Sequence, residues 1–280
     1  MMQLQTRLLL SGLGFGESPR WHQNKLWLSD MSLRQVMAVD INGKSEKIIE
    51  IPAQPSGLGW LPDGRLQVIS MTDRRLLRLD QGVLTEVADL SGLASGICND
   101  MVVDKVGRSY IGNFGLNTDL KQRRIGPAEI ILVTPEGKAQ VAATDLVFPN
   151  GTVITPDGRE LIVAETFANR LTAFDIKPDG SLSKHRVWAE LDNNMLPDGI
   201  CLDAEGAIWT AIAFRPEVIR VKRGGEVTHR INLSGQAIAC MLGGIDRRTL
   251  FILTAEPRSK SRTAGQLEVV KVEVPGAGLP

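Results

Sequence analysis

LPDGRLQVIS, at residues 61–70, is a turn that leads directly into a short apolar run, and this arrangement repeats along the chain. Similar stretches lie at 103–112 (VDKVGRSYIG), 155–164 (TPDGRELIVA) and 202–211 (LDAEGAIWTA), with looser versions at 22–30 (HQNKLWLSD) and 245–254 (IDRRTLFILT). Each apolar run has the length of a strand rather than of a helix. Strand-based units that repeat every ~40–50 residues are typical of the blades of a β-propeller.

Further strands are predicted after the first two strands of each unit. Third strands are expected at 35–40, 75–80, 129–134, 170–175, 217–222 and 266–272, and fourth strands at 46–51, 84–88, 139–143, 185–191 and 228–233. The last unit lacks a fourth strand, whereas residues 4–10 (LQTRLLL) form a strand without a unit. Pairing these two would close the ring and cover a sheet edge. The sequence therefore predicts an all-β fold: a six-bladed β-propeller of four-stranded blades, closed by the N-terminal strand, as a single domain over residues 1–280.

Composition limits the classes of partner. Lys plus Arg equals Asp plus Glu at 32 each, and there is no dense basic run, so neither nucleic acid nor an anionic membrane is expected as a partner. Leu8 to Leu10 are too short an apolar run for a signal peptide, and no stretch has the length of a membrane span. The three cysteines, Cys98, Cys201 and Cys240, have no metal-type spacing and are expected as small buried side chains of a cytoplasmic protein.

One residue of each unit is predicted to face the central channel. Counting back six residues from each turn gives the start of the innermost strand, and these ring positions hold Glu17, Ser56, Asn99, Asn150, Asp198 and Cys240. Packing alone would favour apolar residues there, yet four of the six offer a hard oxygen ligand. Such a set suits one divalent metal ion, calcium first, with magnesium, manganese, zinc and iron(II) as alternatives.

The ring positions allow two kinds of metal site. Ser56 and Cys240 are poor ligands for a hard ion, which would leave coordination positions for water or substrate, as a catalytic metal needs. A calcium ion that only stabilises the centre of the ring would use the same oxygen ligands.

Loops between second and third strands return to the same end of the channel as the ring positions. The longest spans 113–128 (NFGLNTDLKQRRIGPA), and loops of this size are often binding loops or lids. The residues expected at a partly apolar entrance are Met31, Phe114, Phe167, Phe214 and Arg215.

Histidine does not provide a catalytic base in this interpretation. His22, His185 and His229 lie in strand contexts that favour structural or solvated roles, and no Ser-His-Asp or Cys-His arrangement can be assembled. A general base would therefore be a carboxylate, and Asp198 and Asp100 are the candidates.

Four short stretches resemble the regucalcin (senescence marker protein) and gluconolactonase family of six-bladed propeller hydrolases. They are FGESPRWH (15–22), ND (99–100), PNG (149–151) and PDGI (197–200). The resemblance implies a divalent metal bound by Glu17, Asn150 and Asp198, with Asn99 on the metal or the substrate. It also implies hydrolysis of a lactone, with Asp198 as the proposed base.

The chain departs from this family in the half of the site that recognises sugars. Members that act on sugar lactones usually carry RxNDG, whereas the sequence here reads Ile97-Cys98-Asn99-Asp100-Met101. The missing arginine favours a less polar lactone or ester, unless Arg123 or Arg124 of the long loop replaces its charge.

A metal-dependent lactonase is thus the first hypothesis. Its small-molecule lactone or ester would contact Asn99, Asp100, Phe114, Phe167 and Phe214. The alternatives are a phosphotriesterase-like or esterase-like hydrolase on the same metal site and a non-catalytic calcium-binding propeller.

Overall fold

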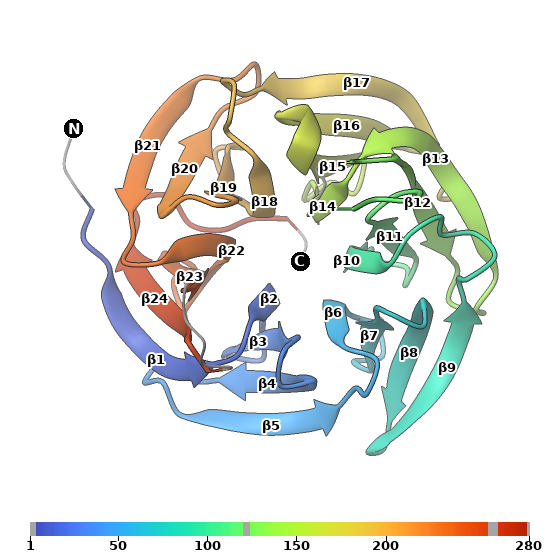
Figure 1. Cartoon of the computed structure of the whole chain (residues 1–280), viewed down its shortest axis with the longest axis horizontal. Coiled ribbons are helices and arrows are strands. Elements are labelled where there is room, and N and C mark those ends of the chain that lie inside the picture. The colour runs from blue at the N-terminus through green and yellow to red at the C-terminus, as the bar shows by residue number, and fades with distance from the viewer. Residues whose placement is uncertain (1–3, 120–123, 257–262, 279–280) are drawn as a thin grey trace.

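The computed structural model of the protein describes residues 4–119, 124–256 and 263–278. Six antiparallel sheets of four strands surround a central axis like blades (Figure 1). The predicted all-β, six-bladed propeller is therefore confirmed. The first, innermost strands are β2 (Gly16–His22), β6 (Pro55–Trp60), β10 (Cys98–Val103), β14 (Pro149–Ile154), β18 (Pro197–Leu202) and β22 (Gln236–Gly243).

The remaining strands follow outward in each blade. Second strands are β3 (Lys25–Asp30), β7 (Leu66–Ser70), β11 (Ser109–Asn113), β15 (Glu160–Glu165), β19 (Ile208–Ile212) and β23 (Thr249–Ala255). Third strands are β4 (Gln35–Val39), β8 (Arg75–Asp80), β12 (Pro127–Val133), β16 (Arg170–Ile176), β20 (Glu217–Val221) and β24 (Gly265–Lys271). Outer strands are β5 (Ser45–Glu50), β9 (Val83–Asp89), β13 (Ala139–Val147), β17 (Leu182–Glu190), β21 (Val227–Asn232) and β1 (Arg7–Leu13), and one 3₁₀ turn, η1 (Thr166–Ala168), follows β15.

The N-terminal strand β1 closes the ring by pairing antiparallel with β24 of the last blade. Its bounds, Arg7–Leu13, correct the predicted 4–10 by three residues. The leucine run suggested a strand that ends at Leu10, but pairing continues through an irregular register to Leu13 opposite Gly265. Leu13 is buried, so its contact with the core fixes this end of the strand.

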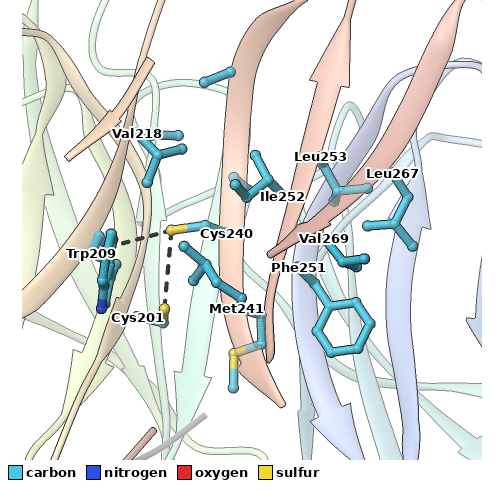
Figure 2. Close-up of a cluster of buried hydrophobic side chains, with 14 of the residues drawn as sticks. Cys201, Trp209, Val218, Cys240, Met241, Phe251, Ile252, Leu253, Leu267 and Val269 are labelled. Atoms are coloured by element: carbon cyan, nitrogen blue, oxygen red, sulfur yellow. Dashed lines mark hydrogen bonds between the residues drawn. The ribbon is translucent and has the colours of Figure 1, made fainter. Parts of the chain in front are cut away.

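Buried apolar side chains fill the space between neighbouring blades. Strands β10, β14 and β18 are buried along their whole length, because each is covered on both faces by the adjacent blades. Figure 2 shows part of the largest core cluster, in which Cys201 and Cys240 lie with their Sγ atoms 4.0 Å apart. All three cysteines are free and buried, which confirms their predicted packing role.

Every innermost strand has an irregular register near its start. The shifts lie between Glu17 and Arg20, Pro55 and Leu58, Cys98 and Met101, Pro149 and Thr152, Pro197 and Ile200, and Ala237 and Ala239. A bulge changes the direction in which a side chain points. Asn99, Asn150 and Asp198 fall inside these irregular segments and Glu17 lies at the edge of one, so the bulges direct these four side chains towards the channel.

The sixth ring position requires a correction. Residue Ile238, not Cys240, lies in the irregular segment of β22 and faces the channel. Strand β22 has eight residues, whereas β6, β10, β14 and β18 have six, so counting back six residues from the turn stops short of the ring. Cys240 instead packs against Cys201 and the carbonyl oxygen of Trp209.

The C-terminal segment runs across the other end of the propeller. Ala204 N donates to Pro275 O, and Ala277 N donates to Leu202 O, which fixes the segment beneath the fifth blade. In Figure 1, the last described residues of this segment approach the central axis. In the described ranges, no helix has the length and apolarity needed to cross a membrane.

Candidate active and metal site

A small cavity opens at the end of the channel where the innermost strands begin. Its volume is about 220 Å³, and oxygen-bearing side chains share its wall with apolar ones. The lining residues are Phe15, Glu17, Met31, Asn99, Phe114, Phe148, Asn150, Thr166, Phe167, Asp198, Ala213, Phe214, Gln236 and Ile238. The structure therefore brings Glu17, Asn99, Asn150 and Asp198 into one cavity, as the counting of ring positions predicted.

The two asparagines are oriented by hydrogen bonds that use their amide nitrogens. Asn99 Nδ2 donates to Pro149 O at 3.3 Å, and Asn150 Nδ2 donates to Thr166 Oγ1 at 3.2 Å. Thr166 Oγ1 in turn donates to Pro197 O at 2.8 Å, and this bond orients the hydroxyl that accepts the hydrogen bond from Asn150. Since the nitrogens are occupied, both amide oxygens remain available as ligands.

The two carboxylates at the site lie in an environment that disfavours their charge. Burial, followed by the negative charges of Asp198 and Asp100, raises the pKa of Glu17 well above its usual range. Burial and Asp100 likewise raise the pKa of Asp198, to about 8, although the hydrogen bond from Asn150 opposes this. Keeping two buried carboxylates ionised side by side costs free energy unless a positive charge lies between them.

One carboxylate oxygen at the site lacks any hydrogen-bond partner. Asp198 Oδ1 is buried and unpaired, although buried polar atoms in native proteins are almost always satisfied. Within the described ranges, no group of three or more His, Cys, Asp or Glu could hold a metal, so the amide oxygens of Asn99 and Asn150 would have to complete a ligand set. Two carboxylates, one of which has an unpaired buried oxygen, and two amide oxygens fit a hard divalent cation.

Asp100, the other candidate base, is bound by a buried arginine. Arg20 Nη2 donates to Asp100 Oδ1 at 2.6 Å and to Met101 O at 2.6 Å, while Arg20 Nε donates to Leu58 O. Asp100 does not line the cavity, and Arg20 is only 3% exposed. Asp100 therefore lies behind the cavity wall, where its negative charge helps to raise the pKa of Glu17 and Asp198.

The entrance residues predicted from the sequence take different positions. Met31, Phe114, Phe167 and Phe214 line the cavity, whereas Arg215 does not. The ring residue Ser56 is also absent from the wall, and its hydroxyl is buried without a partner in the described part of the chain.

The long loop predicted at 113–128 begins after β11 and folds back on itself before β12. Asp119 and Arg124 form an isolated antiparallel bridge, and Arg124 Nε donates to Asn117 O. Arg124 is not on the cavity wall, and Arg123 lies outside the described residues. His22 stacks on Trp60 at 4.0 Å, away from the cavity.

Several lining residues were not predicted. Phe15 and Phe148 each come two residues before a ring residue, so the repeat register could have identified them. Thr166 could not be found in this way, because its role depends on the contact with Asn150 in the folded chain.

Six four-stranded blades around a cavity with several oxygen-bearing side chains define a propeller with a candidate small-molecule or metal site at one end of its channel. Residues 15–256 match the model of the SMP-30/Gluconolactonase/LRE-like region, so the chain belongs to this family. The resemblance seen in the sequence motifs is thereby confirmed.

Curated relatives include lactonases. The chain is 26% identical over 278 residues to a 6-deoxy-6-sulfogluconolactonase of Pseudomonas putida, which covers 95% of this chain and 94% of the relative. It is 23% identical over 256 residues to a pentonolactonase of Haloferax volcanii, covering 89% of this chain and 84% of the relative. Among solved structures, a calcium-binding protein, regucalcin, from Agrobacterium tumefaciens superposes with a TM-score of 0.84 at 24% identity, covering 99% of this chain and 97% of the other, which shows a shared fold.

Proposed function

We propose that the protein is a divalent-metal-dependent hydrolase that opens a lactone ring. The observation that carries this proposal is the unpaired, buried Asp198 Oδ1 in a cavity that also contains Glu17, Asn99 and Asn150. Membership of the family and the names of the lactonase relatives support the reaction class. Calcium is the first candidate ion because every available donor is a hard oxygen.

The residues of the chain would divide the work as follows. Glu17, Asn150 and Asp198 would hold the ion, with Asn99 beside it or on the substrate. When bound, a divalent ion polarises a carbonyl and lowers the pKa of water. Asp198 would accept the proton of the attacking water. The water oxygen bonds to the carbonyl carbon, the ring C–O bond breaks, and the proton passes to the ring oxygen, which gives a hydroxy acid.

Metal analysis and a lactone panel together test this proposal. The purified protein should retain about one calcium ion after mild chelation, and Glu17→Gln should retain much less. Aliphatic, aromatic and sugar lactones assayed with several divalent ions should include at least one substrate, whose turnover stops when a strong chelator removes the metal completely and returns when metal is added.

The same panel separates the alternatives. Turnover of a phosphotriester without turnover of any lactone would support the phosphotriesterase alternative. Stoichiometric calcium without turnover of any ester would support a binding propeller, and equally low metal in wild type and Glu17→Gln would remove the basis for the site.

A further inference from the structure

The mouth of the candidate site is lined by aromatic side chains. Five of the seven phenylalanines of the chain line this one cavity, and the remaining two lie elsewhere. The wall members are Phe15, Phe114, Phe148, Phe167 and Phe214. Such a concentration is unexpected at the entrance of a site that has only to admit polar molecules, because exposed aromatic surface costs free energy in water.

Three of these rings form a packed cluster. Phe114 stacks on Phe148 with centroids 4.5 Å apart, and Phe167 meets Phe148 edge-to-face at 5.1 Å. Phe148 is 5% exposed and has a φ of 56°, a conformation that a bulky side chain rarely adopts. Phe214, with a φ of 63°, is 65% exposed at the rim. The three clustered rings therefore form a preformed apolar wall, and Phe214 adds an exposed ring to the lining of the same cavity.

The wall has negative charge and no positive charge. Glu17 and Asp198 are the only charged side chains among the described residues that line it. With a divalent ion held by the two carboxylates, the charges of the ion and its ligands roughly cancel, and no basic side chain among the described lining residues is left to pair with an anionic substituent, whose desolvation would be largely uncompensated. The site therefore favours a neutral substrate.

Few polar atoms remain to receive the hydroxyls of a sugar. Thr166 Oγ1 already accepts from Asn150 and donates to Pro197 O, and the Asn99 amide nitrogen is used by Pro149 O. Among the other lining residues, Gln236 offers a single side-chain amide, and the sixth ring residue is the apolar Ile238. A polyhydroxylated ring would lose hydrogen bonds to water and find few replacements.

We infer that the substrate is a neutral lactone that carries an alkyl or aryl substituent, with its carbonyl at the ring residues and its apolar group against Phe114, Phe148 and Phe167. This inference rests on the proposed lactonase function and specifies the substrate class of that site. It departs from the sugar substrates in the names of the relatives.

Three lactones of one ring size test the inference in the calcium-loaded protein: δ-valerolactone, δ-decalactone and glucono-δ-lactone. We expect kcat/KM to be at least tenfold higher for δ-decalactone than for δ-valerolactone, because the alkyl chain is buried on the aromatic wall, and ~10²-fold higher than for glucono-δ-lactone. Turnover of glucono-δ-lactone as fast as, or faster than, that of δ-decalactone would overturn the inference and leave the lactonase proposal intact.

A variant tests whether the preference for δ-decalactone over δ-valerolactone comes from the aromatic wall. Phe167→Ala should lower kcat/KM for δ-decalactone about tenfold and change that for δ-valerolactone by less than about twofold. Ile245→Ala is the matched control, because Ile245 is 98% exposed and lies in the turn between β22 and β23, at the opposite end of the channel. Equal losses on both lactones in Phe167→Ala would contradict the inference, since a general structural defect would affect both.

A binding measurement keeps the inference testable if no lactone is hydrolysed, an outcome that would count against the proposed function alone. Calorimetry would compare two lactams that resist hydrolysis, 6-pentyl-2-piperidone and gluconolactam. We expect the pentyl lactam to bind at least tenfold more tightly, with a negative heat-capacity change from apolar burial. Equal or tighter binding of gluconolactam would overturn the inference.

Discussion

Asp198 has two roles in the proposed reaction, as a ligand and as a base, and a single substitution can separate them. Asp198→Asn keeps a coordinating oxygen but removes the proton acceptor. We expect turnover of the best lactone to fall ~10²–10⁴-fold while much of the bound metal is retained. Rates must be compared at saturating metal, because a fall in occupancy would otherwise imitate a fall in chemistry. Near-wild-type turnover with the metal bound would exclude Asp198 as the base.

Asp100→Asn provides the comparison for Asp198→Asn. Because Arg20 holds the Asp100 carboxylate and Asp100 does not line the cavity, its loss should affect turnover far less than the loss of Asp198. A larger loss of turnover in Asp100→Asn than in Asp198→Asn would reverse the two assignments.

Arg20 is predicted to contribute to stability through its buried ion pair. Arg20→Met would leave Asp100 buried without its cation, which typically costs ~3–5 kcal/mol. The double variant Arg20→Met/Asp100→Leu should recover part of that loss, because it removes the unpaired charge as well. Denaturant midpoints of Arg20→Met, Asp100→Leu and the double variant measure the effect. If the double variant lost as much stability as the sum of the single variants, the two residues would not be coupled.

Residue identities at the site were predictable only where the repeat register marks them. Glu17, Asn99, Asn150 and Asp198 stand out because a polar residue replaces an apolar one at matched positions. The bond between Arg20 and Asp100 joins residues 80 positions apart, and no local pattern indicates it.

Bulges at the starts of the innermost strands are the elements that direct the ring residues into the channel, and glycines permit their close packing. A Cβ on Gly151 would lie 2.5 Å from Ile200 N and 2.6 Å from Asp198 O, which are backbone atoms of the next blade. Adjacent blades could not approach as closely with a side chain at this position. Because Asp198 belongs to the contacted segment, the packing also positions a site residue.

Gly151→Ala is expected to destabilise the protein by ~1–3 kcal/mol, since the clash is with backbone that cannot rotate away. Gly92→Ala is the matched control, because a Cβ there meets nothing within 4 Å and its φ is not in the left-handed region. Thermal or urea unfolding should show a clear loss for Gly151→Ala and a change within about 0.5 kcal/mol for Gly92→Ala. Similar values for the two variants would argue against tight packing between these blades.

Strand positions were predicted well and strand starts less well. A turn followed by an apolar run defines where β7, β15 and β19 lie, because turn chemistry and burial are both local. The extra length of β22 left no mark in the apolar pattern, and so the ring position was assigned to Cys240 instead of Ile238. The bulges are irregularities of the backbone, and the pattern of apolar and polar residues did not predict their positions.

The architecture of the whole molecule followed from repetition, and its closure followed from an imbalance in strand count. One blade lacked an outer strand and one strand lacked a blade, so pairing them was the arrangement that left no open edge. The aromatic mouth was only partly predictable, because Phe114, Phe167 and Phe214 come from three separate links that the ring brings together. Composition alone gave no sign that the phenylalanines gather at one cavity.

Ring closure leads to a prediction about truncation. Removing residues 1–10 would delete the pairing of Arg7, Leu8 and Leu10 with Val269, Glu268 and Leu267, and would leave most of β24 as an open edge. We expect a melting temperature several degrees lower, well beyond the effect of trimming a tail without partners, and a greater tendency to aggregate. Leu8→Ser is the control, because Leu8 is 54% exposed and the substitution leaves the backbone pairing in place. An unchanged melting temperature in the truncated protein would show that the pairs made by Arg7, Leu8 and Leu10 are not needed to hold the ring closed.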